Sequence, residues 1–528
     1  MDLPKLLQAL TEVRAYPFPV DKVEVRQTHI SMVFLAGPVA YKIKKPVCFS
    51  FVDFSTLEKR RYYCEREIQL NRRLAPQVYH GVVPITQTEG GIAVEGQGPV
   101  VEWAVKMNRL PDEATLEWRV QHGQLQPATL VQVAERLAGF HRHAERNAEI
   151  AAHATAERVA ELAYGNLDIA RQQVGLTITA CVYQRLLELT KSRWAELRDL
   201  FEDRARRLVP CDTHGDLRLE HIYLLPEYSP PHDITIIDCV EFNDAFRYAD
   251  PVADMAFVVM DLLYENRRDL AQVFADSYFQ ASGDEEGRKL LSWYVAYRAG
   301  VRGKVRSLLA EEAEVAAEYR QRARAEARRY WLLALQALEI PARRPVVILV
   351  AGLPGVGKST VARWLAEHAH CLWLRSDHIR KELAGLQAHD QAATGFAQGI
   401  YSPEWTERTY AEMVRRADSA LAEGRRVVVD ATFSAEAHRQ LFLDLASRWA
   451  VPLLVLLCQA DTDTVRQRLS QRRNDASDAD WFVYQQVAQR WQPLTPSLQR
   501  QSFILNTARR LVEVHEELHQ LLRTLSLL

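Results

Sequence analysis

The stretch 352–360, which reads Gly-Leu-Pro-Gly-Val-Gly-Lys-Ser-Thr, constrains the possible folds of this chain more than any other segment. It follows the apolar run 346–350 and precedes a helical pattern. Its glycines, Gly352, Gly355 and Gly357, allow consecutive backbone N–H groups to turn toward one centre, where the N-terminus of a helix adds positive potential. The pattern therefore predicts a phosphate-binding loop between a buried strand and a helix.

The last three residues of this stretch indicate how a nucleotide would be held. Lys358 is expected to reach the β- and γ-phosphates of ATP, and the Ser359 hydroxyl to bind Mg²⁺. Thr360 ends the motif and is grouped with the nucleotide-binding residues. Taken alone, such a loop indicates nucleotide binding and leaves the reaction open.

Composition excludes several classes of protein. A chain of 528 residues is too long for one core and should form two or three domains. A net charge of −2 argues against a strongly basic surface, so any nucleic-acid site would be a local patch. The seven cysteines form no C-x-x-C pair, and no apolar run approaches the roughly 18 to 20 residues that cross a bilayer. We therefore expect a cytoplasmic protein with no membrane partner.

A break with two prolines, at 340–345, divides the pattern of elements just before the phosphate-loop strand. After the break, apolar strands alternate with helical patterns, which predicts a parallel sheet with right-handed crossovers. Its predicted strands are 346–350, 371–374, 426–430 and 452–458. The predicted domains are 1–340, with a small lobe at about 20–107 and a helical large lobe at about 111–338, and 343–528.

The first half shows shorter strands and long helical stretches. Its predicted elements are strands within 23–46 around a turn at Gly37-Pro38, a helix at 55–74, a strand pair at 92–107, helices over 127–209, strands near 222–225 and 234–237, and helices over 252–338. This order of elements predicts a mixed α+β half followed by an α/β half.

The first half also carries residues suited to phosphoryl transfer. Residues 39–42, Val-Ala-Tyr-Lys, lie in a predicted strand and resemble the lysine-bearing V-A-x-K segment of protein kinases and aminoglycoside phosphotransferases. Lys42 is the matching lysine, and Lys44 on the same strand face competes for the role. The resemblance implies that Glu67 on the next helix pairs with this lysine and that the strand near Met107 leads into a hinge that meets adenine.

The segment 212–217, Asp-Thr-His-Gly-Asp-Leu, is the strongest signal in this half. The same resemblance implies that Asp216 accepts the proton of an acceptor hydroxyl and that Asp238, at a strand end, coordinates Mg²⁺. Farther on, 250–256 resembles the D-P-x-x-D-x-A helix start of aminoglycoside phosphotransferases, where Asp254 would brace the catalytic loop. Agreement at five places in the family's order predicts a bilobal, protein-kinase-like fold.

Two positions depart from that family's pattern. His221 stands where an asparagine usually binds Mg²⁺, and an imidazole is a poorer ligand for this hard cation than an oxygen. Three interpretations stay open: Glu220 substitutes, the lobe uses one metal ion, or the lobe is a degenerate kinase. The segment 28–32 also replaces a glycine-rich nucleotide loop, so the first half is expected either to turn over ATP or to act as a pseudokinase.

Residues after the phosphate loop favour a phosphotransferase over a motor ATPase. Asp377 follows a strand and resembles the base of polynucleotide 5′-kinases, in which the arginine at the position of Arg380 contacts substrate phosphate. Asp430 ends another strand and suits the Mg²⁺ shell or the acceptor. Arg468 and Arg472, four apart on a helix face, resemble the lid of the same kinases, whose cations stabilise the transferring phosphate. An ordinary helix N-cap for the first aspartate and ordinary surface charges for the lid arginines are the alternatives.

As a whole, the chain resembles bacterial two-domain proteins that join an aminoglycoside phosphotransferase-like module to a P-loop module similar to polynucleotide kinase or zeta toxin. The resemblance implies a bilobal kinase-like fold followed by a P-loop domain with a parallel sheet flanked by helices. It also implies an ATP- and Mg²⁺-dependent kinase that phosphorylates a hydroxyl acceptor, with a polynucleotide or nucleotide 5′-OH as the leading candidate. A small-metabolite kinase and an N-terminal pseudokinase that regulates its neighbour are the alternatives, and the oligomeric state stays open.

Overall fold

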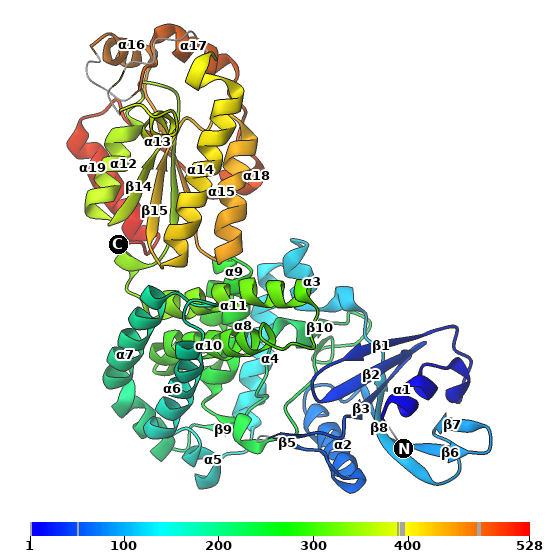
Figure 1. Cartoon of the computed structure of the whole chain (residues 1–528). Helices are drawn as coiled ribbons and strands as arrows, with labels where there is room; N and C mark the ends of the chain where they lie inside the picture. The colour runs from blue at the N-terminus through cyan, green and yellow to red at the C-terminus, as the bar shows by residue number, and fades with distance from the viewer. Residues whose placement is uncertain (1–2, 50–51, 388–389, 391–396, 472–476) are drawn as a thin grey trace. The chain divides into compact units, whose positions relative to one another are not determined.

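The computed structural model describes residues 3–49, 52–387, 390, 397–471 and 477–528. The chain forms two compact units, Met1–Leu162 with Glu196–Val295 and Ala163–Ala195 with Ala296–Leu528 (Figure 1). This grouping follows packing, and the sequence-based domain limits stay a prediction. Within the described residues, no helix combines the length and the apolarity needed to cross a bilayer.

The first unit begins with a six-stranded antiparallel sheet in the order β1-β2-β3-β8-β6-β7. Its strands are β1 (Val23–Gln27), β2 (Ser31–Ala36), β3 (Val39–Lys44), β6 (Tyr79–Thr88), β7 (Gly91–Val94) and β8 (Val100–Asn108). The predicted turn at Gly37-Pro38 joins β2 to β3 and is confirmed. The predicted pairing of the two strands within 92–107 is wrong, because β6 lies between β7 and β8. Gly81 and Pro84 interrupt β6 and hide it in the sequence, since both residues disfavour strand interiors.

The remainder of the first unit is mainly helical, as predicted. Its helices are α1 (Leu3–Leu10), α2 (Leu57–Asn71), α3 (Leu116–Gln121), α4 (Pro127–His143), α5 (Ala148–Ala152), α8 (Pro251–Tyr264) and α9 (Arg268–Ser282). Short antiparallel ladders pair β4 (Cys48–Phe49) with β5 (Val52–Asp53), β9 (Cys211–Asp212) with β12 (Tyr248–Ala249), and β10 (Ile222–Leu224) with β11 (Ile234–Ile236). Helices α6 (Ala156–Gln172), α7 (Ala180–Arg206) and α10 (Leu291–Leu309) contribute residues to both units.

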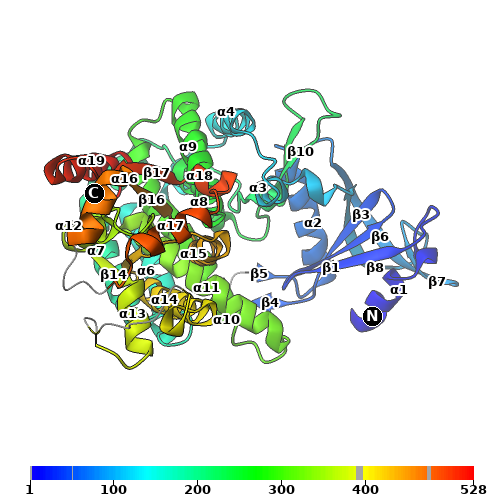
Figure 2. The ribbon, with the colours of Figure 1, turned by 90° about the horizontal axis from the view of Figure 1, so that it is seen from above.

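Alternation along β3 sorts its side chains onto two faces of the first sheet. Tyr41 and Ile43 pack on the face that α1 covers, whereas Ala40 packs on the face that α2 covers. Figure 2 shows these two helices on opposite sides of the sheet. Lys42 and Lys44 share the face of Ala40, so the strand period directs both ammonium groups toward α2.

The second unit contains a five-stranded parallel sheet in the order β14-β15-β13-β16-β17. Its strands are β13 (Val347–Ala351), β14 (Cys371–Arg375), β15 (Arg426–Asp430), β16 (Leu453–Gln459) and β17 (Ser502–Asn506). Every residue of β13 is buried, as expected for a central parallel strand. The predicted parallel sheet is confirmed, and β17 is an edge strand that was not predicted; Leu505 is its one buried residue.

Helices cover both faces of this parallel sheet. The helices of the second unit after α10 are α11 (Ala317–Leu338), α12 (Lys358–His368), α13 (Ser376–Leu383), α14 (Pro403–Ala422), α15 (Glu436–Trp449), α16 (Thr462–Gln471), α17 (Trp481–Gln489), α18 (Pro496–Gln499) and α19 (Leu511–Thr524). Helices α12 and α19 pack on the face that carries Ile348 and Val350, and α14 and α15 lie on the other face (Figure 1). The carboxyl ends of the strands therefore meet at one edge, where the phosphate loop begins.

Candidate active sites

The phosphate loop has the geometry that its glycines predict. Gly352, Gly355 and Gly357 have φ values of 143°, 80° and 96°, which favour glycine. A Cβ atom at Gly352 would lie 2.5 Å from the carbonyl oxygen of Cys458, so no larger residue fits there without displacement. Gly357 directly precedes α12, whose first residue is Lys358. The predicted order of strand, loop and helix is confirmed.

Asp430 lies beside this loop at the end of β15. The pairing of β15 with β13 and β14 places it level with Val350 and Arg375. The residue is 3% exposed, and burial raises its pKa, while Lys358 and the hydrogen bond from Ser359 oppose that rise. Its Oδ2 accepts no hydrogen bond from the described residues and lies 3.9 Å from Arg375 Nε.

These groups fit a bound Mg²⁺ ion. Mg²⁺ prefers oxygen ligands and usually keeps part of its shell for water and substrate phosphates. The Ser359 hydroxyl and the orphaned Asp430 Oδ2 would supply oxygen ligands, directly or through water. Among the described residues, no three or more His, Cys, Asp or Glu side chains are grouped so that they could hold a metal by themselves. Lys358 Nζ donates to the Leu353 carbonyl at 2.9 Å, so its ammonium is folded over the loop.

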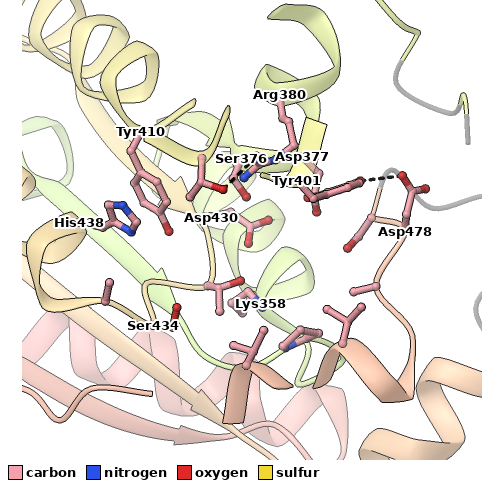
Figure 3. A pocket seen from close by; sticks show the side chains of 18 of the residues that line it. Lys358, Ser376, Asp377, Arg380, Tyr401, Tyr410, Asp430, Ser434, His438 and Asp478 are labelled. Carbon is pink, nitrogen blue, oxygen red and sulfur yellow. Dashed lines mark hydrogen bonds between the residues drawn. The ribbon is translucent and has the colours of Figure 1, made fainter. Parts of the chain in front are cut away.

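A cavity of about 540 Å³ adjoins the loop (Figure 3). The structure brings together there the predicted residues Lys358, Asp377, Arg380 and Asp430. Other side chains that line it include Ser376, Tyr401, Tyr410, Ser434, His438 and Asp478. The cavity therefore lies at the carboxyl edge of the sheet, where ligands of α/β folds bind.

Arg380 is buried in the wall of this cavity and is 7% exposed. Its Nη1 donates to the Ile400 carbonyl at 2.7 Å and to Thr406 Oγ1 at 3.3 Å, and its guanidinium lies 5.2 Å from the centre of the Tyr401 ring. Burial lowers the pKa of Arg380, although Asp377 opposes this effect. Its Nε is buried without a hydrogen-bond partner among the described residues. A buried guanidinium with an unsatisfied donor is costly, so this wall is suited to an anionic group.

Several other side chains of the same cavity form a polar and aromatic cluster that no sequence motif marks. The Tyr401 hydroxyl donates to Asp478 Oδ2 at 2.6 Å, and Lys381 Nζ lies 3.3 Å from Asp478 Oδ1. Burial, together with the hydrogen bond to Asp478, raises the pKa of Tyr401 far above its ordinary value. The rings of Tyr410 and His438 stack with centroids 3.8 Å apart. None of these residues belongs to a motif, so only the fold reveals their proximity.

Arg468 lines a second cavity, of about 390 Å³, that also borders the phosphate loop. Its Nη2 donates to the Thr507 carbonyl at 2.7 Å, and its Nη1 has no hydrogen-bond partner in the described part of the chain. A Cβ atom at Gly357 would lie 3.4 Å from that Nη1, so the guanidinium is close to the loop. Arg472, its predicted companion, lies outside the described residues. The catalytic role of both arginines stays a prediction.

In the first unit, five charged side chains meet beside β3 and α2. Lys42 Nζ lies 2.6 Å from Asp238 Oδ1 and 2.9 Å from Glu67 Oε1. Lys44 Nζ contacts Glu67 and Glu241, and the Lys44 and Glu67 side chains are fully buried. Both candidate lysines therefore reach the predicted glutamate, but Lys42 is the one that reaches the predicted metal aspartate. Glu241 was not predicted, because no motif marks it.

The protonation of this cluster follows from charge pairing. Burial alone would lower the pKa of Lys42 and Lys44, but the carboxylates outweigh burial and raise both. Burial alone would raise the pKa of Asp238, yet Lys42 and its neighbours hold it well below the ordinary value. Two ammonium groups and three carboxylates leave a net negative charge, and Asp238 supplies the oxygen that suits Mg²⁺.

Asp254 braces the loop before Asp216, as predicted. Its Oδ2 accepts the His214 N–H at 3.0 Å, and its Oδ1 accepts the Gly215 N–H at 2.9 Å. Burial lowers the pKa of His214 to about 4, so its ring is neutral at pH 7 and bonds the Ile237 carbonyl at 2.9 Å. The Asp216 side chain stays 35% exposed, on a loop that is held from behind.

His221 faces three carboxylates, those of Asp216, Glu220 and Asp238. Its Nδ1–H donates to the Asp216 carbonyl at 2.8 Å, and its Nε2 lies 3.6 Å from Asp238 Oδ2 and 3.9 Å from Glu220 Oε1. Burial alone would lower the pKa of His221, but Asp238, Asp216 and Glu220 outweigh burial and raise it. A carboxylate oxygen suits Mg²⁺ better than an imidazole nitrogen does, so this environment favours Asp238 as the ligand. Metal binding by His221 stays a prediction.

The hinge and the nucleotide-loop region also have defined places. Met107 lies one residue before the end of β8, between Ala40 and Tyr79 of the neighbouring strands, and its side chain packs on the α2 face. The Thr28 N–H donates to the Ser31 carbonyl at 2.9 Å and closes a tight turn between β1 and β2. The turn contains no glycine, the residue that lets backbone N–H groups approach phosphate closely. Adenine binding near Met107 stays a prediction.

Comparisons with known proteins match both halves of the chain. A family model described as phosphotransferase enzyme family matches residues 57–291, and one described as AAA domain matches residues 347–494. Uncharacterized proteins of Mycobacterium tuberculosis and Mycobacterium bovis are each 32% identical over 457 residues, which cover 87% of this chain and 88% of theirs.

Solved structures match parts of the chain. A choline/ethanolamine kinase family protein from Mesorhizobium loti is 14% identical and covers 63% of this chain and 99% of its own, with a TM-score of 0.37. A gluconokinase from Sinorhizobium meliloti is 17% identical and covers 35% of this chain and 94% of its own, with a TM-score of 0.25.

Proposed function

We propose that this chain, which belongs to the family of these mycobacterial proteins, uses its C-terminal domain to transfer the γ-phosphoryl group of ATP to a hydroxyl of a small acceptor that also carries an anionic group. The protein is an ATP-dependent kinase that joins a phosphotransferase-family domain to a P-loop kinase-like domain. Kinases of these families generally use ATP with Mg²⁺. The identity of the acceptor is the new element of the proposal.

The buried guanidinium of Arg380 is the main support for this proposal. Its guanidinium is buried, its Nε lacks a hydrogen-bond partner among the described residues, and it lines the cavity that also holds Asp377. A carboxylate or phosphate of the acceptor would satisfy that donor and neutralise the buried charge. The same contact would leave a hydroxyl of the acceptor free to approach Asp377.

The size and the charge of the cavity support a small acceptor. A volume of about 540 Å³ lies in the range of small-molecule sites. The described lining balances four cationic side chains with four anionic ones: Lys358, Arg375, Arg380 and Arg490, against Asp377, Glu407, Asp430 and Asp478. A polynucleotide site should instead show an excess of positive charge along a groove. The lining therefore favours a metabolite with one anionic group over a polynucleotide.

Named side chains would perform each part of the transfer. Asp377 would accept the proton of the acceptor hydroxyl. The hydroxyl oxygen would form a bond to the γ-phosphorus while the bond between the γ-phosphorus and the β,γ-bridging oxygen breaks. Lys358 and Arg468 would stabilise the charge that develops on the phosphoryl oxygens. Bound Mg²⁺ would neutralise part of the phosphate charge, and Ser359 with Asp430 would hold it.

The decisive experiment measures transfer of radiolabelled γ-phosphate from ATP to acceptors matched for shape and differing in charge. The set contains a hexose, the corresponding sugar acid and sugar phosphate, a nucleoside 3′-phosphate, and a 5′-OH oligonucleotide. We expect label on a small anionic member and little on its neutral counterpart. Faster labelling of the oligonucleotide than of the nucleoside 3′-phosphate would instead support a polynucleotide kinase, and equal labelling of charged and neutral partners would refute the role of the anionic group.

Two substitutions connect the result to the cavity. Arg380→Gln should raise KM for the anionic acceptor by about 10- to 100-fold, since a hydrogen bond to a charged group contributes about 1.5–3 kcal/mol, and should leave KM for ATP unchanged. Asp377→Asn should abolish transfer to every acceptor. Arg408→Gln is the matched control, because Arg408 lies on α14, is exposed, and stacks on Trp405 at 4.4 Å without lining the cavity.

A further inference from the structure

The C-terminal end of α2 contacts two loops of the first unit: the catalytic loop, 212–217, and the metal loop, 238–241. Asn71 is 1% exposed, and its Nδ2 donates to the Glu67 carbonyl at 2.9 Å. Its Oδ1 accepts the N–H of Cys239 at 2.9 Å, which fixes the amide in one orientation. One turn of helix therefore separates Glu67 from a bond that holds the metal loop.

Arg73, just beyond the end of α2, joins the helix to the catalytic loop. Its Nη1 donates to the Asp212 carbonyl and its Nη2 to the Thr213 carbonyl, each at 3.0 Å. The same Nη2 lies 3.2 Å from the sulfur of Cys239, whose thiol donates to the His214 carbonyl at 3.3 Å. One guanidinium therefore links both loops to the end of α2.

We propose that Asn71 and Arg73 are positioning residues that set the placement of Asp216 relative to Asp238 in the nucleotide site of the first unit. The bonds involve backbone groups of both loops, so they act on loop position and contribute no reacting atom. Glu67, which pairs with Lys42, lies on the same helix, so the ion pair and the two loops share one rigid support. This role goes beyond the acceptor chemistry of the C-terminal domain and does not depend on it.

Arg72 provides a matched control within the same chain. Its guanidinium also donates to backbone carbonyls, those of Tyr79 at 3.1 and 3.0 Å and of His80 at 2.6 Å. Those carbonyls belong to β6 and not to either loop. Arg72→Gln and Arg73→Gln therefore remove the same charge and hydrogen bonds to backbone carbonyls at neighbouring positions. Arg73→Gln also removes a 3.5 Å ion pair with Asp212 of the catalytic loop, and of the two it alone frees the loops.

The test uses the full-length chain with Lys358→Ala, which removes nucleotide binding by the phosphate loop. Calorimetry gives the affinity for ATP with Mg²⁺ and with EDTA, γ-phosphate release gives kcat and KM, and hydrogen–deuterium exchange of α2 peptides gives the opening free energy of the first unit. Mg²⁺ should increase ATP affinity less in Arg73→Gln and Asn71→Leu than in the parent chain, by about 10- to 100-fold, and kcat should fall by a similar factor. A shift of about 1 Å between Asp216 and Asp238 has effects of that order. ATP affinity in EDTA should not change, and Arg72→Gln should keep the wild-type gain.

Each outcome decides for or against the role. Arg73→Lys keeps the charge but loses the fork, so it should give an intermediate loss, and it provides the same measurement should Arg73→Gln fold poorly. Equal losses for Arg72→Gln and Arg73→Gln would overturn the proposal. Losses that follow only the opening free energy of α2 would overturn it as well. So would an ATP affinity of the Lys358→Ala chain that does not depend on Mg²⁺.

Discussion

Lys44→Met should lower the free energy of unfolding of the first unit by several kcal/mol, because Lys44 is buried between two carboxylates. The Lys44 ammonium contacts Glu67 and Glu241 in a site where the exposed fractions of the three side chains are 0%, 0% and 5%. After the substitution, Lys42 still pairs with Glu67, but Glu241 loses its own cation. Burial already raises the pKa of Glu241, and Lys44 opposes that rise, so the variant should take up a proton at this carboxyl.

The magnitude follows from the proton that Glu241 must bind. Neutralising a carboxyl of ordinary pKa 4.5 at pH 7 costs about 3.4 kcal/mol, at 1.36 kcal/mol per pKa unit. Breaking a buried ion pair by removing one partner typically costs about 3–5 kcal/mol, which agrees. At pH 5.5 the same protonation costs only about 1.4 kcal/mol. Because the folded pKa of Glu241 rises in the variant, its stability should fall as the pH rises above about 4.5.

Hydrogen–deuterium exchange of peptides from β3 and α2 measures the opening free energy of this unit alone, which a melt of the whole two-unit chain does not. Lys106→Met is the matched control on β8, because Lys106 and its partner Glu95 are 26% and 27% exposed and such pairs contribute about 0–1 kcal/mol. Lys44→Met with Glu241→Leu should recover part of the loss. A loss at pH 7 no larger than that of Lys106→Met, or one that does not shrink at pH 5.5, would refute the reasoning.

Two further predictions concern pH and the phosphate loop. Burial lowers the pKa of His214 from 6.5 to about 4. The neutral ring therefore contributes stability that is present above pH 6.5 and is lost as the pH falls toward 4. About 2 kcal/mol should therefore disappear between pH 7.5 and pH 5, seen by exchange of the catalytic loop, and His214→Gln should flatten that profile; an equally steep variant would contradict the assignment. Gly352→Ala should abolish nucleotide binding by the phosphate loop in calorimetry, because its Cβ would meet the Cys458 carbonyl at 2.5 Å. Gly385 has a positive φ of 71° but open space around it, so Gly385→Ala should lower the free energy of unfolding by about 1–2 kcal/mol and leave nucleotide binding intact. Equal effects of the two substitutions on binding would exclude the clash as the cause.

Local sequence patterns predict the structural features that depend on short spans of chain. The glycines of 352–360 predict the phosphate loop because backbone conformation at those positions is local. The parallel sheet follows from apolar strands that alternate with helices, and the kinase-like first half follows from motifs in a known order. β6 was missed because Gly81 and Pro84 interrupt its pattern, and packing between β7 and β8 outweighs that local preference.

Tertiary structure decided how those features are combined. Lys42 and Lys44 share one strand face, so the strand period cannot separate them, and only the packing of α2 and the metal loop directs one to Asp238 and the other to Glu241. Contacts between segments far apart in the chain have no local pattern, which is why the sequence alone did not predict the partners of Arg73. The sequence thus predicted phosphate-binding residues at two places, and the fold decided which side chains surround each place.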